Sequence, residues 1–183
     1  MFIWPTRWDI PFSDPSFSCS SYDNCHVPWG STHESVWNKV KNNDFISGMY
    51  IWTGFDYIGE PTPFGFPARS SYFGIVDLAG FPKDVYYMYQ SEWTDKDVLH
   101  VFPHWNWTKG ETVDVWAYYN NADEAELFLN GISQGVKKKE NEQLHVSWRL
   151  NFEPGAIKVV SRKNGKEILT SEIKTAGEPS QIR

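Results

Sequence analysis

The sequence predicts two domains of different class, an α/β part in residues 1–96 and an all-β antiparallel sandwich in residues 97–183. A helix–strand–helix pattern fills residues 31–93, which is the order of elements typical of α/β folds. From residue 97 onward, short alternating apolar runs dominate, and Asn-Gly pairs separate some of them. The boundary between the two domains is therefore expected between residues 94 and 100.

The first predicted element is a helix over about residues 32–43. Ser31 or Thr32 is a suitable N-cap, and Glu34 stands three residues after Ser31, as in a capping box. The near-continuous apolar run Phe45–Phe55 then predicts a strand that is covered on both faces, as in a parallel sheet.

A loop and a second helix complete the first domain. Residues 56–71 contain three prolines, which predicts a loop. After Pro82, apolar residues recur at helical spacing, which predicts a helix over residues 82–93.

The second domain shows the two-residue periodicity of strands. One predicted strand places four apolar side chains on the same face, namely Val113, Val115, Ala117 and Tyr119. Asn130-Gly131 and Asn164-Gly165 are typical of type I′ hairpin turns. Five or more such strands in about eighty-five residues predict an antiparallel sandwich.

Charge and hydropathy argue against two classes of partner. The formal net charge is −6, and the only basic run, Lys137–Lys139, is followed by acids, so we expect no nucleic-acid partner. No apolar stretch approaches the roughly 20 residues that span a bilayer, so we expect no membrane partner. The first residues lack the features of a signal peptide. The cellular location is left open, and a periplasmic or extracellular one requires a signal peptide in the full-length protein.

The two cysteines, Cys19 and Cys25, do not indicate a metal site. Two ligands are too few for structural zinc, and the sequence contains no CxxC pair. Two free thiols are favoured over a local disulfide. No cofactor is expected from this sequence.

Five stretches in a fixed order resemble glycoside hydrolase family 2, especially its bacterial β-galactosidases. They are SGMYIWTGFDYIGEPTPF, SSYFGIVDLAGFPKDVYYMYQSEW, HWNW, AELFLNGISQG and EPGAIKVVSRKNGKEI. The resemblance implies that residues 44–56 and 82–93 are the last strand and helix of a (β/α)8 barrel. It also implies that residues 97–183 are an immunoglobulin-like sandwich appended to that barrel.

The resemblance implies a retaining glycosidase that uses two glutamates, and both would precede this chain. No catalytic residue is therefore expected here, and a mono- or divalent cation in the complete enzyme is not indicated by these residues. Trp52 would be a stacking platform beneath a sugar, with a barrel-core role as the alternative. Asp56 and Glu60 would either accept hydrogen bonds from sugar hydroxyls or pair with Arg69. Trp52–Glu60 would lie at the C-terminal end of a barrel strand, where barrels carry their chemistry.

Other residues are assigned structural roles. Asp77 and Lys83 are expected to fix the loop before the second helix. Trp105 and Trp107 are expected to seal the joint between barrel and sandwich, although a sugar-facing role is the alternative. Asn141-Glu142 lies in a charged connection between strands and is interpreted as solvated rather than catalytic.

The lack of a cationic side chain at one position narrows the expected class of substrate. Family β-glucuronidases carry Asn-x-Lys before the glycine that matches Gly74, whereas this sequence has Ser71, Tyr72 and Phe73 there. The expected partner is thus a neutral β-galactoside, with a β-mannoside as runner-up. A carbohydrate-binding or spacer role for the sandwich is the alternative function. On its own, the chain is expected to self-associate through apolar faces that a complete barrel would cover, or to leave part of residues 1–96 irregular.

Overall fold

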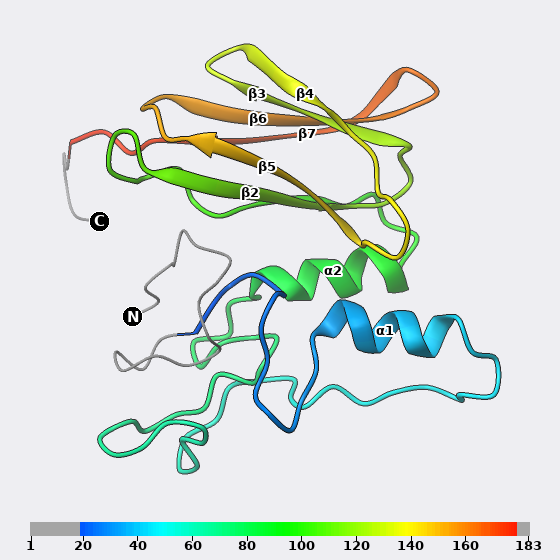
Figure 1. Cartoon of the computed structure of the whole chain (residues 1–183), viewed down its shortest axis with the longest axis vertical. Helices are drawn as coiled ribbons and strands as arrows, with labels where there is room; N and C mark the ends of the chain where they lie inside the picture. Colours follow the sequence, from blue (N-terminus) through cyan, green and yellow to red (C-terminus); the bar gives the residue numbers. More distant parts are fainter. Residues whose placement is uncertain (1–18, 179–183) are drawn as a thin grey trace. The chain divides into compact units, whose positions relative to one another are not determined.

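The computed structural model describes residues 19–178 and consists mainly of β-sheet with two short helices (Figure 1). Two compact units make up the chain. One comprises Met1–Thr94 and Asn141–Leu144, and the other comprises Asp95–Glu140 and His145–Arg183. Neither helix of the described residues has the length and apolarity needed to cross a membrane.

Seven strands form the second unit and pair into two antiparallel sheets. One sheet has the strand order β1-β2-β5, and the other has the order β4-β3-β6-β7. The predicted all-β sandwich is confirmed for this unit. The strands are β1 (Leu99–Phe102), β2 (Thr112–Tyr119), β3 (Glu124–Leu129), β4 (Ile132–Lys137), β5 (His145–Asn151), β6 (Ala156–Lys163) and β7 (Lys166–Lys174).

Both predicted Asn-Gly turns close hairpins. Asn130 and Gly131 join β3 to β4 with φ angles of 50° and 83°, and Asn164 and Gly165 join β6 to β7 with 50° and 76°. Type I′ turns require positive φ at both central residues, and Asn followed by Gly tolerates this better than other residue pairs. These local choices set the registers of both hairpins.

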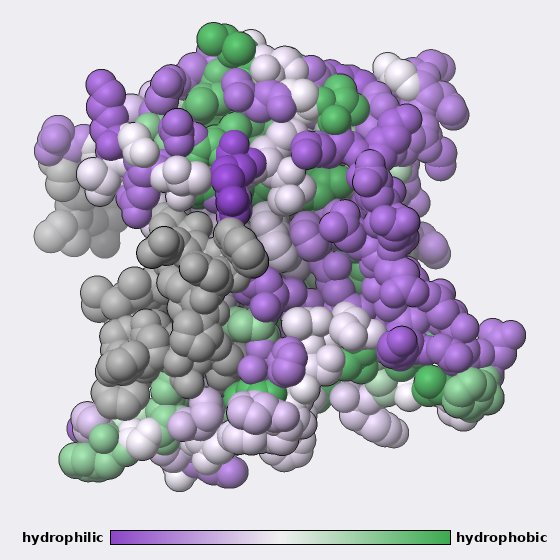
Figure 2. Space-filling model, in the orientation of Figure 1, coloured by the Kyte–Doolittle hydropathy of each residue, from purple (hydrophilic) through white to green (hydrophobic). Residues whose placement is uncertain are grey.

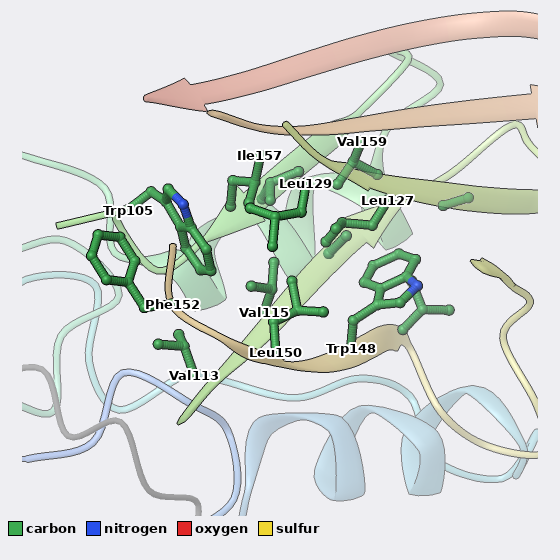
Figure 3. Close-up of a cluster of buried hydrophobic side chains, with 14 of the residues drawn as sticks. Trp105, Val113, Val115, Leu127, Leu129, Trp148, Leu150, Phe152, Ile157 and Val159 are labelled. Atoms are coloured by element: carbon green, nitrogen blue, oxygen red, sulfur yellow. The ribbon is translucent and has the colours of Figure 1, made fainter. Parts of the chain in front are cut away.

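The core of the sandwich lies between the two sheets and takes side chains from both (Figure 3). Val113, Val115 and Ala117 of β2 are fully buried and share one core cluster with Leu127 and Val159 of the opposite sheet. The predicted shared face of β2 is confirmed. In the view of Figure 2, hydrophobic residues form scattered patches among hydrophilic ones over the strands.

Trp105 belongs to this core, so the expectation that it seals a joint between domains was wrong. Its side chain is 0 % exposed, packs edge-on against Phe152 and donates from Nε1 to the carbonyl of Glu153 at 3.0 Å. The indole hydrogen bond satisfies the one polar atom that burial would otherwise leave unpaired. Trp107 is partly buried against the same core.

The first unit contains α1 (His33–Lys41) and α2 (Asp84–Trp93), which confirms both predicted helices. Thr32 is the N-cap of α1, and its hydroxyl accepts from the Ser35 amide at 3.4 Å. The predicted capping box does not form. The Glu34 carboxylate instead accepts from the amide of Leu144, at the end of the 141–144 segment.

The predicted strand over residues 45–55 was wrong. Phe45, Tyr50 and Phe55 are exposed, and these residues form no strand beyond a single parallel bridge between Phe55 and Val76. A strand needs hydrogen-bonding neighbours along its length. Among the described residues, only 73–76 supplies them, through bonds to residues 53–56.

Two experiments test the sandwich: production of the domain alone tests whether it folds independently, and truncation of a core side chain tests its packing. We expect residues 95–183 produced alone to unfold in one cooperative transition, because strand alternation, turn chemistry and core burial agree locally. Leu127→Ala should lower the free energy of unfolding by about 2–5 kcal/mol, because Leu127 is fully buried.

The matched control is Ile132→Ala, because the Ile132 side chain is 70 % exposed. Its cost should stay within about 0.5 kcal/mol. Urea denaturation followed by circular dichroism measures both variants, and equal losses in the two would contradict the core assignment.

Candidate functional site

A cavity of about 900 Å³ lies in the first unit and combines aromatic rings with acidic side chains. Such linings suit sugars, because the C–H faces of a sugar ring pack on aromatic rings while carboxylates accept from its hydroxyls. The aromatic residues that line it are Tyr22, Trp29, Trp52, Tyr57, Tyr72, Phe73 and Phe81. Asp23, Glu60, Asp77 and Asp84 supply the carboxylates.

Trp52 lines this cavity with 74 % of its side-chain surface exposed. Its Nε1 donates to the Tyr57 hydroxyl at 3.2 Å, and the two rings meet edge to face at 6.2 Å between centroids. Tyr57 therefore fixes the orientation of the indole. The exposed surface of the indole is available for stacking.

Asp56 is buried and does not line the cavity. Its Oδ1 accepts from the Lys83 ammonium at 2.7 Å and from the Gly74 amide at 2.8 Å. The sequence left open whether Asp56 binds sugar or pairs with Arg69. Asp56 forms its ion pair with Lys83, and these contacts hold together the segments that carry Trp52 and Phe73.

Gly74 is required by this close approach. A Cβ at residue 74 would lie 2.1 Å from the amide nitrogen of Asp56, so any side chain would force the two segments apart. Lys83 also donates to the Tyr72 carbonyl at 3.1 Å. The predicted role of Lys83 in fixing the loop before α2 agrees with these bonds.

Glu60 and Asp77 both line the cavity, and Glu60 is exposed while Asp77 is partly buried. The Oδ1 of Asp77 accepts from the amides of Ala79 and Phe81 at 2.9 Å and 2.8 Å. Asp77 therefore stabilises the turn over residues 77–81, as predicted. Glu60 instead presents its carboxylate at the cavity surface. The structure brings Trp52 and Glu60 to one cavity and places Asp56 behind its wall.

Sequence reasoning missed a second polar cluster, which is partly buried and contributes Asp23 and His33 to the cavity lining. Asp23 accepts from the first two amides of α1, those of His33 and Glu34, at 2.8 Å and 2.7 Å. His33 Nδ1 lies 2.9 Å from the Tyr89 hydroxyl of α2. These residues are up to 66 positions apart and form no sequence motif, so no local signal identifies them.

Burial governs the protonation of this cluster. It raises the pKa of Asp23 against the opposing effect of His33 and the amides of α1. It lowers the pKa of His33, with Lys83 acting in the same direction and Asp23 against it. The pKa of Tyr89 is raised by burial and then by Asp23. A neutral His33 hydrogen-bonded to Tyr89 thus connects the 19–32 loop with α2.

Metal and thiol chemistry find no support in the described part of the chain. Residues 19–178 contain no cluster of three or more His, Cys, Asp or Glu side chains that suits a metal ion. Cys19 and Cys25 line the cavity as thiols rather than as a disulfide. Burial raises the pKa of Cys25, which disfavours its reactive thiolate.

Known proteins resemble this chain over most or all of its length. It is 69 % identical over 183 residues to the β-galactosidase BoGH2A of Bacteroides ovatus, covering 100 % of this chain and 22 % of that protein. It is 40 % identical over 171 residues to a putative β-glucuronidase of Formosa agariphila, covering 90 % and 16 %. A β-glycosidase structure from Bacteroides vulgatus superposes with a TM-score of 0.81 at 36 % identity, covering 91 % and 21 %.

Structures described as family 2 members from Bacteroides cellulosilyticus also match, one with a TM-score of 0.72 at 28 % identity over 82 % of this chain and 24 % of that one. The chain matches a segment of glycoside hydrolase family 2 proteins. Residues 110–169, within the sandwich, match a domain of unknown function, DUF4982. The chain spans about a fifth of the length of the β-galactosidase that it matches.

The buried ion pair behind the cavity wall is testable in this chain. Lys83→Met should destabilise the first unit by about 3 kcal/mol or more, because Asp56 would remain as a buried charge without its counterion. The Gly74 amide, which donates to Asp56, should then exchange its hydrogen faster than in the wild type.

Lys41→Met is the matched control, because its pair with Glu92 is the more exposed of the two. Exposed pairs contribute about 1 kcal/mol or less. Unchanged exchange at Gly74 in Lys83→Met would show that the pair does not hold the two segments together.

Proposed function

We propose that this chain forms part of the sugar-binding cavity and the following sandwich of a retaining glycoside hydrolase that acts on β-galactosides. The main support for this proposal is the cavity, whose lining includes both Glu60 and the exposed ring of Trp52 in a fixed orientation. The similarity to a β-galactosidase over the full chain supports the same activity for the longer protein.

Residues 1–96 would be the C-terminal part of a (β/α)8 barrel. The parallel hydrogen bonding of residues 53–56 with 73–76, followed by α2, is consistent with a barrel fragment whose other strands lie elsewhere in the longer protein. Such strands would also explain the apolar run Phe45–Phe55, which reads as covered on both faces yet is exposed in this chain. Its exposure supports the expectation that the isolated chain self-associates.

Residues 97–183 would be the appended immunoglobulin-like domain. Its seven strands in a three-plus-four arrangement agree with that class of sandwich. A carbohydrate-binding role for this domain is less favoured. Its exposed large hydrophobic residues among those described are Ile132 and Val136, and neither offers an aromatic platform. A spacer role agrees better with this surface.

Three residues would form the substrate-binding contribution of the chain. Trp52 would stack beneath the non-reducing galactose, and Glu60 would accept hydrogen bonds from its hydroxyls. Asp56 would act from behind the wall by fixing Gly74 and Lys83. Both catalytic glutamates would come from the preceding part of the longer protein, since retaining chemistry needs two carboxyl groups about 5–5.5 Å apart across the scissile bond.

A neutral sugar is favoured over a glucuronide, although several relatives are named β-glucuronidases. Phe73 lines the cavity at the position where family β-glucuronidases carry lysine. Lys83 is the one Lys or Arg among the described lining residues, and its ammonium contacts Asp56. The described lining therefore offers a uronate carboxylate no uncommitted Lys or Arg, while four carboxylates of the lining would repel it. A β-mannoside fits the same neutral lining and is the second candidate.

Turnover by the full-length protein tests this function. We expect hydrolysis of nitrophenyl β-galactoside at a kcat/KM at least about tenfold above that for nitrophenyl β-glucuronide, since the tenfold ratio needs only about 1.4 kcal/mol of differential binding. The 183-residue chain alone should show none. A preference for the glucuronide or the mannoside would overturn the substrate assignment.

Trp52→Ala in the full-length protein should lower kcat/KM for the galactoside by about tenfold to several hundredfold. The estimate takes the loss of one stacking and positioning contact as about 1.5–3.5 kcal/mol. Trp37→Phe is a suitable control, because Trp37 lies outside the cavity lining and packs on Trp93. An unaltered kcat/KM in Trp52→Ala would return Trp52 to a structural role.

A further inference from the structure

Trp29 is a second exposed tryptophan of the cavity lining, and sequence reasoning assigned it no role. Its side chain is 64 % exposed. It occupies a turn closed by the bond from the Gly30 amide to the Val27 carbonyl at 2.9 Å. Pro28 precedes it and restricts the backbone further.

Both ends of this turn are anchored. Val27 is buried, and its carbonyl oxygen also lies 2.8 Å from Nδ1 of His26. On the other side, Thr32 caps α1, whose first amides Asp23 binds. The Trp29 backbone is thus held in place while its ring stays exposed. An aromatic ring held in this way binds a ligand at low entropic cost.

The other described tryptophans differ in this respect. Each has a ring partner or an indole hydrogen bond within the chain, as Trp52 has with Tyr57 and Trp148 has with the Gly135 carbonyl. Trp29 has neither among residues 19–178. A large apolar ring exposed at a cavity without an intramolecular partner is the pattern expected of a ligand platform.

We propose that Trp29 is the stacking platform for the leaving-group sugar, the ring joined to the galactose that Trp52 would hold. This inference rests on the proposed function. The cavity volume lies near the upper end of the roughly 300–1,000 Å³ of sites for ligands of drug size, which leaves room for more than one hexose ring. A neutral saccharide is the fitting leaving group, because the turn around Trp29 carries no lysine or arginine.

Two substrates separate the roles of the two tryptophans in the full-length protein. Lactose has a sugar as its leaving group, whereas the leaving group of β-galactosyl fluoride is a fluoride ion, which cannot stack on an aromatic ring. Trp29→Ala should lower the lactose-to-fluoride ratio of kcat/KM by about tenfold, which is about 1.4 kcal/mol of lost stacking. Trp29→Phe keeps an aromatic face and should restore most of the ratio. Trp52→Ala should lower kcat/KM for both substrates and leave the ratio within about threefold.

The outcomes distinguish this inference from the function beneath it. A wild-type protein that hydrolyses neither substrate overturns the proposed function and the inference with it. Wild-type turnover combined with an unchanged ratio in Trp29→Ala overturns the inference alone. Circular dichroism of Trp29→Ala, expected to match that of the wild type because the side chain is exposed, separates a binding effect from misfolding.

Discussion

The carboxylate of Asp56 lies where three segments of the first unit meet. It receives the Gly74 amide and the ammonium of Lys83, the N-cap residue of α2. A buried ion pair often adds little net stability, because desolvation offsets the attraction, but it fixes geometry since either partner alone is costly. Gly74 permits the approach, as no Cβ fits there. The positions of Trp52 and Phe73 relative to α2 depend on this junction.

Helix α2 supports both walls of the candidate site. At its start, Lys83 binds the Asp56 junction behind Trp52, and one to two turns later Tyr89 bonds His33 at the beginning of α1. Asp23 ties the amides of that first turn to the loop that carries Trp29. The two exposed tryptophans of the cavity lining thus lie on separate loops that share one helix as scaffold. Rigid elements of this kind hold binding groups more accurately than loops alone.

The sequence predicted the features whose causes are local. Alternation in β2, the Asn-Gly turns and the Thr32 N-cap of α1 depend on neighbours a few residues away, and the structure has them, although the predicted capping box does not form. Features set by distant partners were missed or wrong. The run Phe45–Phe55 has the composition of a buried strand but lacks hydrogen-bonding neighbours along its length among the described residues. Trp105 lies in the sandwich core because of its packing against residues distant in the sequence, which no local pattern indicates. The Asp23–His33 contact joins residues ten apart with no motif to indicate it, and exposed Trp29 is indistinguishable in sequence from a core tryptophan.

A segment that would leave both catalytic glutamates to the rest of the enzyme can still contribute to catalysis. In the proposed enzyme, Trp52 and Trp29 would hold the two rings on either side of the scissile bond. Binding energy from parts that do not react can align the bond with the carboxylates, and such alignment is worth several kcal/mol when the geometry is fixed in advance. Fixing requires that each ring platform resist displacement by the substrate. Tyr57 and the Asp56–Lys83 pair do this for Trp52, whereas the Val27 anchor and the capped start of α1 do it for Trp29. The buried polar contacts therefore serve the proposed chemistry through the rigidity of the walls, at a distance from the reacting atoms.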